Sequence, residues 1–171
     1  ACYTGPANTA GKGQCQAGER TCENGQLGLC NGQVLPDTEV CGDGNDNDCD
    51  SATDEENADG CDYYFKDEDQ DGVGANATKC LCGAGGFGGG EAPAYTALEN
   101  GDCDDSNPSS KPGNPELCDT PYDDNCNSLA NEDGSLGCSN FYFDGDSDGY
   151  GVGSAVCKCG PTDPYDATTT G

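Results

Sequence analysis

Histidine, methionine and tryptophan are absent from this chain of 171 residues, and six lysines and arginines stand against 33 aspartates and glutamates. Histidine is the usual general acid or base near neutral pH, so its absence argues against acid–base catalysis. The formal net charge of -27 repels the phosphates of nucleic acids and of anionic membranes. We therefore expect no enzymatic activity, no catalytic residues and no cofactor-binding residues, and we expect cations as partners.

Residues that build hydrophobic cores are also scarce. Leucine, valine and phenylalanine together supply 17 of 171 residues, and isoleucine is absent. A chain so poor in apolar residues and so highly charged has a composition typical of disordered proteins, so something other than burial must hold a fold together. No apolar run approaches the roughly 20 residues of a membrane-spanning helix, and no leader sequence is visible. We expect a soluble, mature chain without membrane insertion.

Fifteen cysteines provide one source of stability. Such usage is typical of oxidising compartments, because cytosolic thiols are kept reduced. Zinc binding is the alternative, but structural zinc sites use CxxC pairs or mixed Cys and His sets, and the chain has neither. The sequence therefore predicts a disulfide-stabilised protein that is secreted, extracellular or on the surface of a bacterial cell.

An internal repeat with a period of 77 residues follows the N-terminal region, since Cys138 lies 77 residues after Cys61 and many acidic and cysteine positions share this register. We predict a Cys-rich cap module at 1–33, a first metal-binding repeat at 34–110 and a second repeat at 111–171. Gly, Asn, Asp and Pro interrupt nearly every window. The expected fold is small, disulfide-rich and calcium-stabilised, mostly loops and turns with little helix.

The best strand candidates are the aromatic segments 63–65 and 141–143, because Tyr and Phe favour half-buried positions in sheets. The Gly-rich stretch 82–100 is expected to be a long surface loop. Within each acidic Cys-x7-Cys segment the short spacing predicts the disulfides Cys41–Cys49 and Cys118–Cys126.

Two loops place carboxylates at positions 1, 3 and 5 with glycine at position 6, which is a calcium-binding pattern. Position 12, where an EF-hand has a bidentate Glu, holds Thr78 or Ala155, so these loops are not EF-hands. A solvated run of Asx turns is the alternative. The predicted ligands are Asp67, Asp69, Asp71 and the carbonyl of Val73 in the first loop, and Asp144, Asp146, Asp148 and the carbonyl of Tyr150 in the second.

A further set of candidate ligands lies in and around the Cys-x7-Cys segments. Amide oxygens bind calcium more weakly than carboxylates, so the copy with more Asn is expected to bind more weakly. A third group around Cys103 is expected to complete the shell of a neighbouring loop, with its disulfide fixing the carboxylates. The residues are Asp46, Asp48, Asp50 and Asp54 in the first copy, Asp123, Asn125 and Asn127 in the second, and Asp102, Asp104 and Glu116 in the third group.

Three segments carry a resemblance to a known family: Gly101-Asp-Cys-Asp-Asp, Pro112-Gly-Asn-Pro-Glu-Leu-Cys118 and Cys41-Gly-Asp-Gly-Asn-Asp-Asn-Asp-Cys49-Asp. They resemble bacterial metal-binding motif repeats named for the copper protein MopE, over residues 34–171. The resemblance implies metal ligation by the Asp clusters. Copper itself is not expected, because copper prefers His, Met or thiolate ligands. The calcium pattern is also similar to thrombospondin type 3 repeats.

The second repeat is expected to be incomplete. Tyr165-Asp-Ala-Thr-Thr-Thr-Gly171 aligns with Tyr95-Thr-Ala-Leu-Glu-Asn-Gly101, so the counterpart of Asp102 would follow residue 171. The cysteine sets also differ, with Cys61, Cys80, Cys82 and Cys103 in the first repeat and Cys138, Cys157 and Cys159 in the second. We expect completion by further repeats or by head-to-tail self-association.

Two functions follow from these features. The first is an extracellular structural protein, a subunit of a rod, stalk or filament stabilised by calcium and disulfides. The second is a calcium-dependent adhesin or carbohydrate-binding module. A solvent-open ion beside aromatic side chains would favour the adhesin.

Overall fold

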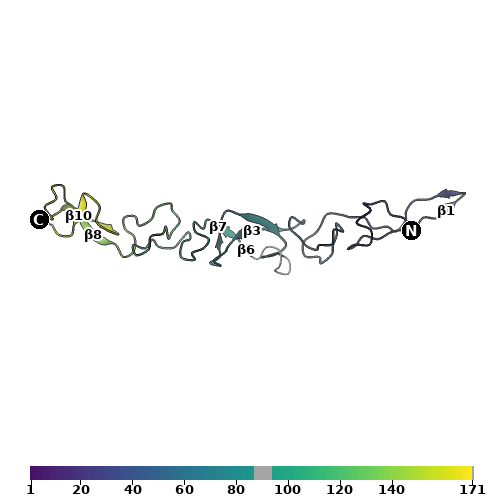
Figure 1. The fold of residues 1–171 in the computed structure, drawn as a ribbon, viewed down its shortest axis with the longest axis horizontal. Coiled ribbons are helices and arrows are strands. Elements are labelled where there is room, and N and C mark those ends of the chain that lie inside the picture. The colour runs from purple at the N-terminus through teal and green to yellow at the C-terminus, as the bar shows by residue number, and fades with distance from the viewer. Residues whose placement is uncertain (87–93, 171) are drawn as a thin grey trace. The chain divides into compact units, whose positions relative to one another are not determined.

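The computed structural model describes residues 1–86 and 94–170, and this part contains short strands and no helix. Figure 1 shows the strands as short arrows separated by long loops. No helix in the described part could span a membrane. The strands are β1 (Cys22–Glu23), β2 (Gln26–Leu27), β3 (Asp62–Lys66), β4 (Val73–Gly74), β5 (Thr78–Leu81), β6 (Tyr95–Ala97), β7 (Glu99–Asn100), β8 (Ser139–Phe143), β9 (Val152–Lys158) and β10 (Tyr165–Ala167).

The predicted class of a small, disulfide-rich and mostly loop fold is confirmed. The chain forms two compact units, one of residues 1–67 and 77–99 and the other of residues 68–76 and 100–171. The sequence-based division into a cap and two repeats stays a prediction. Both aromatic segments form strands as predicted. Part of the expected Gly-rich loop, residues 87–93, lies outside the described residues, and β6 and β7 end the loop earlier than predicted.

The first unit contains a three-stranded sheet in which β3 lies between β5 and β6. β3 and β5 pair antiparallel from Asp62 opposite Leu81 to Phe65 opposite Thr78. Leu81 and Ala97 are buried and supply much of the small apolar core of this sheet. A two-stranded ribbon, β1 with β2, lies nearer the N-terminus, where the Asn24–Gly25 pair with positive φ closes a tight hairpin.

The second unit repeats the three-stranded sheet with β8 between β9 and β10. Ser139 lies opposite Lys158, which is the Asp62–Leu81 register displaced by 77 residues. Phe141 is buried, and Phe143 packs edge to face on Tyr165 with ring centroids 5.7 Å apart. The shared register shows that the sequence repeat is also a structural repeat.

Seven disulfides cross-link the chain, and six of them follow one scheme used twice. Closing loops in this way limits the entropy of the unfolded chain, which substitutes for a large core. The seventh bond, Cys2–Cys30, lies in the N-terminal region. The six are Cys15–Cys49, Cys41–Cys82 and Cys61–Cys80, and then Cys103–Cys126, Cys118–Cys159 and Cys138–Cys157.

The predicted pairs Cys41–Cys49 and Cys118–Cys126 are wrong. The Cys41 N–H donates to the Asp59 carbonyl at 2.9 Å, and the Asn57 N–H donates to the Cys80 carbonyl at 3.0 Å. Cys41 therefore lies beside the segment that carries Cys82, its actual partner. Spacing along the chain favoured the nearest cysteine, whereas backbone hydrogen bonds between distant segments decide the pairing.

The expected shortage of a cysteine in the second repeat is also wrong. Cys157 and Cys159 pair with Cys138 and Cys118, so this repeat is fully bonded. Cys103 belongs with Cys126 and not with the first repeat's sheet. The odd cysteine is Cys22, which is exposed in β1.

Peptide mapping under non-reducing conditions tests this scheme. We expect one peptide pair linking Cys41 to Cys82, its counterpart linking Cys118 to Cys159, and one alkylatable thiol per chain at Cys22. The alkylated but unreduced protein is the starting material, so that exchange is blocked. A peptide joining Cys41 to Cys49 would contradict the scheme.

Candidate metal-binding sites

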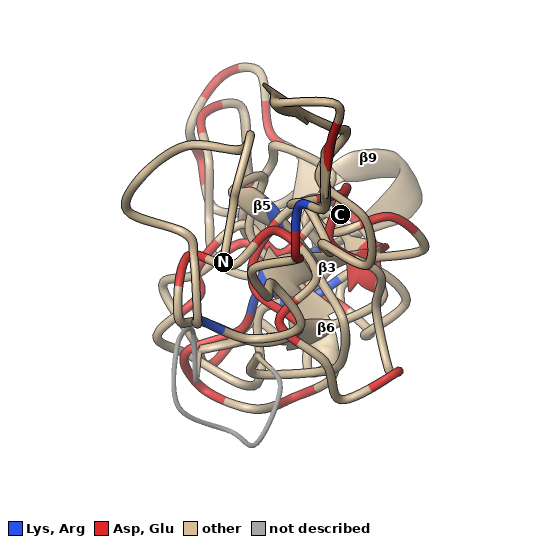
Figure 2. Ribbon diagram, turned by 90° about the vertical axis from the view of Figure 1, so that its right-hand side faces the viewer, with Lys and Arg blue, Asp and Glu red and all other residues tan. Residues whose placement is uncertain are grey.

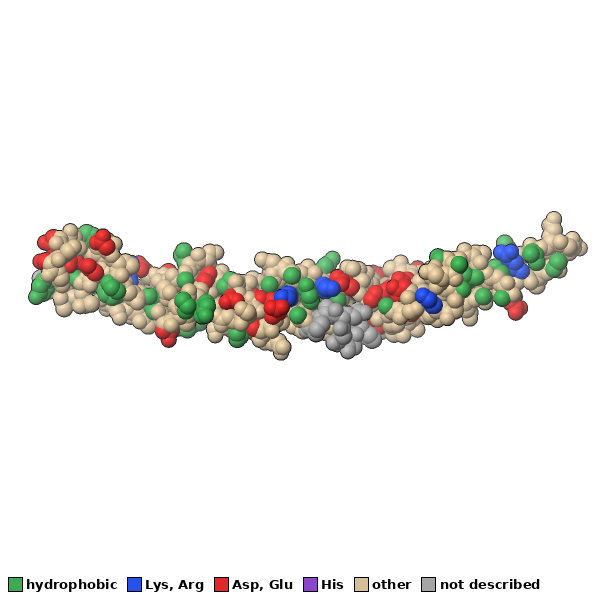
Figure 3. Space-filling model, viewed as in Figure 1, with side chains coloured by type: hydrophobic (Ala, Val, Ile, Leu, Met, Phe, Trp, Pro, Cys, Tyr) green, Lys and Arg blue, Asp and Glu red, His purple; other side chains and the backbone are tan. Residues whose placement is uncertain are grey.

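Buried carboxylates are as numerous as buried apolar side chains in the described part of the chain. Figure 2 shows most Asp and Glu residues on loops, and the face in Figure 3 shows them in several separate groups among scattered hydrophobic side chains. A buried charge is costly unless it is paired or coordinates a metal. The buried acids are Glu39, Asp46, Asp54, Asp67, Asp102, Glu116, Asp124 and Asp144, and the buried apolar residues are Cys15, Cys49, Ala58, Cys80, Leu81, Ala97, Phe141 and Ala167.

In the first Cys-x7-Cys segment the chain winds around buried carboxylates. The Glu39 carboxylate accepts backbone N–H groups from Asn47 at 2.7 Å and Asp48 at 3.4 Å on Oε2, and from Asp54 at 2.9 Å on Oε1. Asp46 likewise accepts the N–H groups of Asp50 and Ser51, each at 3.0 Å. In the described part, no lysine or arginine pairs with Glu39, Asp46 or Asp54.

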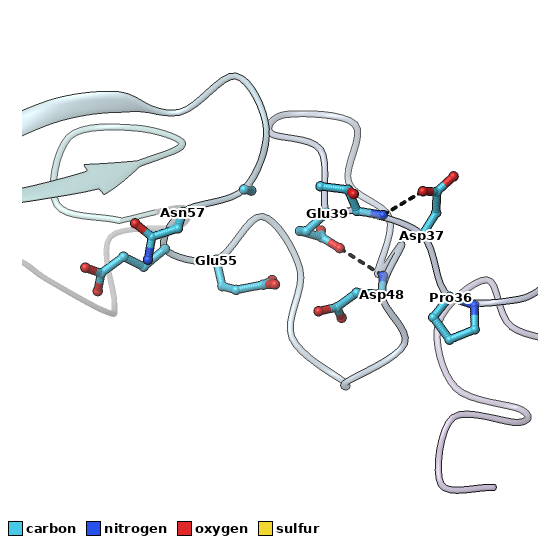
Figure 4. Close-up of a pocket in the computed structure, with 9 residues that line it drawn as sticks. Pro36, Asp37, Glu39, Asp48, Glu55 and Asn57 are labelled. Carbon is cyan, nitrogen blue, oxygen red and sulfur yellow. Dashed lines mark hydrogen bonds between the residues drawn. The ribbon is translucent and has the colours of Figure 1, made fainter. Parts of the chain in front are cut away.

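Two groups of three carboxylates converge in this segment and share Asp48. One oxygen each of Glu39, Asp48 and Glu55 lie within 4.8 Å of one another, as do oxygens of Asp46, Asp48 and Asp50. Figure 4 shows the Glu39, Asp48 and Glu55 carboxylates pointing toward a common region of an open pocket of about 530 Å³. Like charges repel at such distances, so a positive partner would stabilise this arrangement.

Two oxygens in this segment are buried without any hydrogen-bond partner: Asp54 Oδ2 and Glu55 Oε2. Asp54 is 1% exposed, and its other oxygen accepts the Gly42 N–H. Burial raises the pKa of Glu55, and the charges of Glu39, Asp48 and Asp50 raise it further. A bound cation would satisfy both the unpartnered oxygens and the excess negative charge.

The backbone of the second Cys-x7-Cys segment has the same conformation at the positions compared below as that of the first. Positive φ occurs at Cys126, Ser128 and Asn131, 77 residues after Cys49, Ser51 and Asp54. Glu116 accepts the N–H groups of Asp124 and Asn131 at 2.9 and 2.7 Å, as Glu39 does for their counterparts. Asp123 accepts the N–H groups of Asn127 and Ser128, as Asp46 does in the first copy.

The two copies differ around the last glutamate of each segment, Glu55 in the first and Glu132 in the second. Asn125 and Asn127, which replace Asp48 and Asp50, donate side-chain N–H groups to Glu132 Oε1 at 3.1 and 2.7 Å. These bonds, after the backbone N–H of Glu132 itself, hold the pKa of Glu132 below its usual value. Amide donors thus supply part of the positive partner that the first copy lacks. Asp124 Oδ1, Asn131 Oδ1 and Glu132 Oε2 remain buried without partners.

The two alternating Asp loops share their backbone shape. Positive φ occurs at the fourth and sixth positions, Gln70 and Gly72 in one loop and Ser147 and Gly149 in the other. This tight turn directs alternate side chains inward. In each loop one oxygen from each aspartate lies within 4.8 Å of the others, in the sets Asp67, Asp69, Asp71 and Asp144, Asp146, Asp148.

Backbone N–H groups occupy several of these carboxylates. Val73 N–H donates to Asp71, and Tyr150 N–H donates to Asp148, each at 2.8 Å. The roles of the Val73 and Tyr150 carbonyls as ligands stay predictions. Asp144 accepts the N–H groups of Asp148 and Gly149, which lower its pKa although burial opposes the shift.

In the second unit Asp102 lies close to the loop that carries Asp69 and Asp71. Burial raises the pKa of Asp102, and the charges of Asp69, Asp71 and Asp105 raise it further. Asp104 instead accepts the Ser106 hydroxyl at 2.6 Å. Cys103 and Cys126 lie near Asp102 but form a disulfide, so they offer no thiolate to a metal.

Glu39 is a member of the converging carboxylate group that sequence reasoning missed. The signal was present, since Glu39 and Glu116 both stand two residues before a cysteine in the 77-residue register. Only its burial and its three backbone N–H partners show that it organises the segment.

Comparison with known proteins supports the metal-binding interpretation. Residues 36–55 and 102–132 match the family Cu-binding MopE, described as "Putative metal-binding motif". The chain contains two MopE-type motifs. The first motif spans the Glu39, Asp48 and Glu55 group, and the second spans Asp102, Glu116 and the Asn125 region. The alternating Asp loops lie outside both motifs. No curated protein and no solved structure matches the chain.

Proposed function

We propose that this protein is an extracellular, calcium-binding structural protein without catalytic chemistry of its own. Calcium and disulfides together stabilise its loops, and the chain serves as a subunit of a rod, stalk or filament. Its partners are calcium ions and either a second copy of the chain or further repeats. The seven disulfides fit an oxidising, extracellular setting.

The observation that carries this proposal is the carboxylate group of the first MopE-type motif. Glu39, Asp48 and Glu55 converge within 4.8 Å, beside the unpartnered Asp54 Oδ2, and among the described residues no lysine or arginine forms an ion pair with any of the three. A divalent cation resolves both the repulsion and the unsatisfied oxygen.

The donor set favours calcium over copper. All candidate side-chain ligands are carboxylate or amide oxygens, which suit hard cations, and histidine and methionine are absent. Calcium also accepts six to eight oxygens in irregular geometry, whereas magnesium requires a near-ideal octahedron. Irregular loops with many carboxylates therefore fit calcium better than magnesium.

A structural role is favoured over a carbohydrate-binding role. The nine residues that line the pocket around Glu39, Asp48 and Glu55 include no aromatic side chain on which a sugar could stack. The disulfides that flank the first motif, Cys15–Cys49 and Cys41–Cys82, hold its loop in place. Calcium bound there would stiffen the loop.

An exchange of residues between the two motifs tests this proposal. Replacing Asp48 and Asp50 with Asn removes two charges from the first motif and supplies amide donors to Glu55, so we expect its calcium affinity to fall at least tenfold. The reciprocal replacement of Asn125 and Asn127 with Asp is expected to raise the affinity of the second motif at least tenfold. Calorimetric titration with calcium and metal analysis after dialysis measure both.

Each double variant serves as the other's control, because the backbone is shared and the charge changes are opposite. Glu23→Gln, which alters an exposed acid in β1 outside the pocket, controls for net charge. Equal losses from Glu23→Gln and from the Asp48/Asp50 variant would show a general charge effect and contradict the proposed site. Equal affinities in both exchanged variants and the natural chain would contradict it as well.

A further inference from the structure

Two segments of the second unit, Glu68–Asn76 and the stretch that begins at Asn100, are joined by backbone hydrogen bonds. The N–H groups of Gly101 and Asp102 donate to the Gly74 carbonyl at 3.1 and 3.2 Å. The Glu68 N–H donates to Asp105 Oδ1 at 2.8 Å. These bonds hold Asp102 against the loop that contains Asp69 and Asp71.

The Asp102 carboxylate is only half satisfied. Asp102 is 9% exposed, and its Oδ1 accepts the Asp104 N–H at 2.8 Å. Its Oδ2 is buried and has no hydrogen-bond partner. On the adjoining loop the Oδ2 atoms of Asp69 and Asp71 are buried as well. A buried, unpartnered oxygen beside two further carboxylates requires a positive group.

We propose that Asp69, Asp71 and Asp102 together hold one divalent cation of the calcium type, in a composite site assembled from two segments. This inference rests on the proposed calcium-binding function but concerns a different site. Neither Asp69 nor Asp71 belongs to a MopE-type motif, whereas Asp102 opens the second motif. The ion therefore links the second motif to the alternating Asp loop, and the loop alone is an incomplete site.

Lys111 adjusts the charge of this composite site. Its ammonium group donates to the Asp71 carbonyl at 2.8 Å and lies 3.5 Å from Asp71 Oδ2. An ammonium group beside Asp71 offsets part of the negative charge of the three carboxylates. Asp102 Oδ2 has no hydrogen-bond partner of this kind and stays available to the ion.

Hydrogen–deuterium exchange of the natural chain during a calcium titration tests the composite site without any substitution. We expect the amides of Glu68–Asn76 and of Gly101–Asp105 to gain at least tenfold protection at one and the same free calcium concentration. Protection of one segment without the other, or at a clearly different concentration, would overturn the proposal.

Substitution provides the second arm. Asp102→Asn is expected to weaken calcium binding at one site at least tenfold in calorimetric titration and to abolish the shared protection of the two segments. Asp119→Asn removes the same charge from an exposed position of the same unit and is expected to change neither. If Asp102→Asn bound calcium with the same affinity as the natural chain, or if both variants lost the same affinity, the composite site would be overturned.

The same exchange data separate this inference from the proposed function. Protection of residues 41–55 without shared protection of the two segments would leave calcium binding by the first motif intact and would refute only the composite site. An absence of calcium-dependent protection anywhere in the chain would refute both.

Discussion

Removal of calcium from the oxidised protein is expected to lower its melting temperature by about 10–20 °C. A site held at a hundred times its dissociation constant adds about 2.7 kcal/mol, so two such sites add about 5 kcal/mol. For a chain of this size, 1 kcal/mol shifts the melting temperature by about 2–4 °C. The physical cause is the set of buried carboxylates, whose mutual repulsion is uncompensated without the ions. Thermal melts by circular dichroism in calcium and in EGTA measure the shift.

Two controls separate specific binding from simple screening of a chain with a charge of -27. Adding sodium chloride to the EGTA sample screens exposed charges but does not occupy a carboxylate cage. Magnesium at equal concentration is expected to restore less stability than calcium. Full recovery in sodium chloride alone would show that no ion site stabilises the fold, and an unchanged melt in EGTA would contradict the prediction directly.

Replacement of Glu39 or Glu116 by Ala is expected to lower the free energy of unfolding by about 3 kcal/mol in each case. Each carboxylate is buried and accepts backbone N–H groups from two or three residues of its loop. A hydrogen bond to a charged acceptor contributes about 1.5–3 kcal/mol, and the abandoned N–H groups lose their partner inside the protein. Denaturation with guanidinium in saturating calcium, with disulfides intact, measures the loss.

The two variants should differ in metal content. Glu39 converges with Asp48 and Glu55, so Glu39→Ala is expected to lose one calcium ion per chain in addition to stability. The second copy has Asn125 at the position equivalent to Asp48, so Glu116→Ala is expected to lose stability alone. Glu56→Ala, which breaks the exposed pair with Lys79, should cost less than about 1 kcal/mol. A cost that small for Glu116→Ala would contradict the role assigned to this carboxylate.

Local spacing was sufficient to predict the loops. Alternating aspartates followed by glycine specify a tight turn whose side chains meet, and the structure brings together both predicted sets, including Asp144, Asp146 and Asp148. The turn depends on a few consecutive residues and on the positive φ that Gly149 adopts. The 77-residue register likewise predicted two equivalent structures, because similar residues at matching positions can form the same backbone hydrogen bonds.

Spacing did not predict which cysteines pair. Only seven residues separate Cys41 from Cys49, but Cys41 bonds to Cys82, because the backbone bond from Cys41 to Asp59 places it beside the distant segment. The entropic cost of closing a loop grows only slowly with its length, so sequence proximity is a weak guide once tertiary contacts exist. The same reason explains why Cys103 was assigned to the cysteine set of the first repeat although it bonds to Cys126.

The sequence by itself therefore determined the class of fold, the repeat and the chemistry of the candidate ligands, since composition and short-range spacing act on neighbouring residues. Tertiary structure alone decided the rest. It turned Glu39 into the acceptor that organises the first motif, and it brought Asp102 against the loop of Asp69 and Asp71. These placements depend on burial and on hydrogen bonds between segments far apart in the chain, and a sequence so poor in apolar residues carries no hydrophobic pattern that would reveal which segments meet.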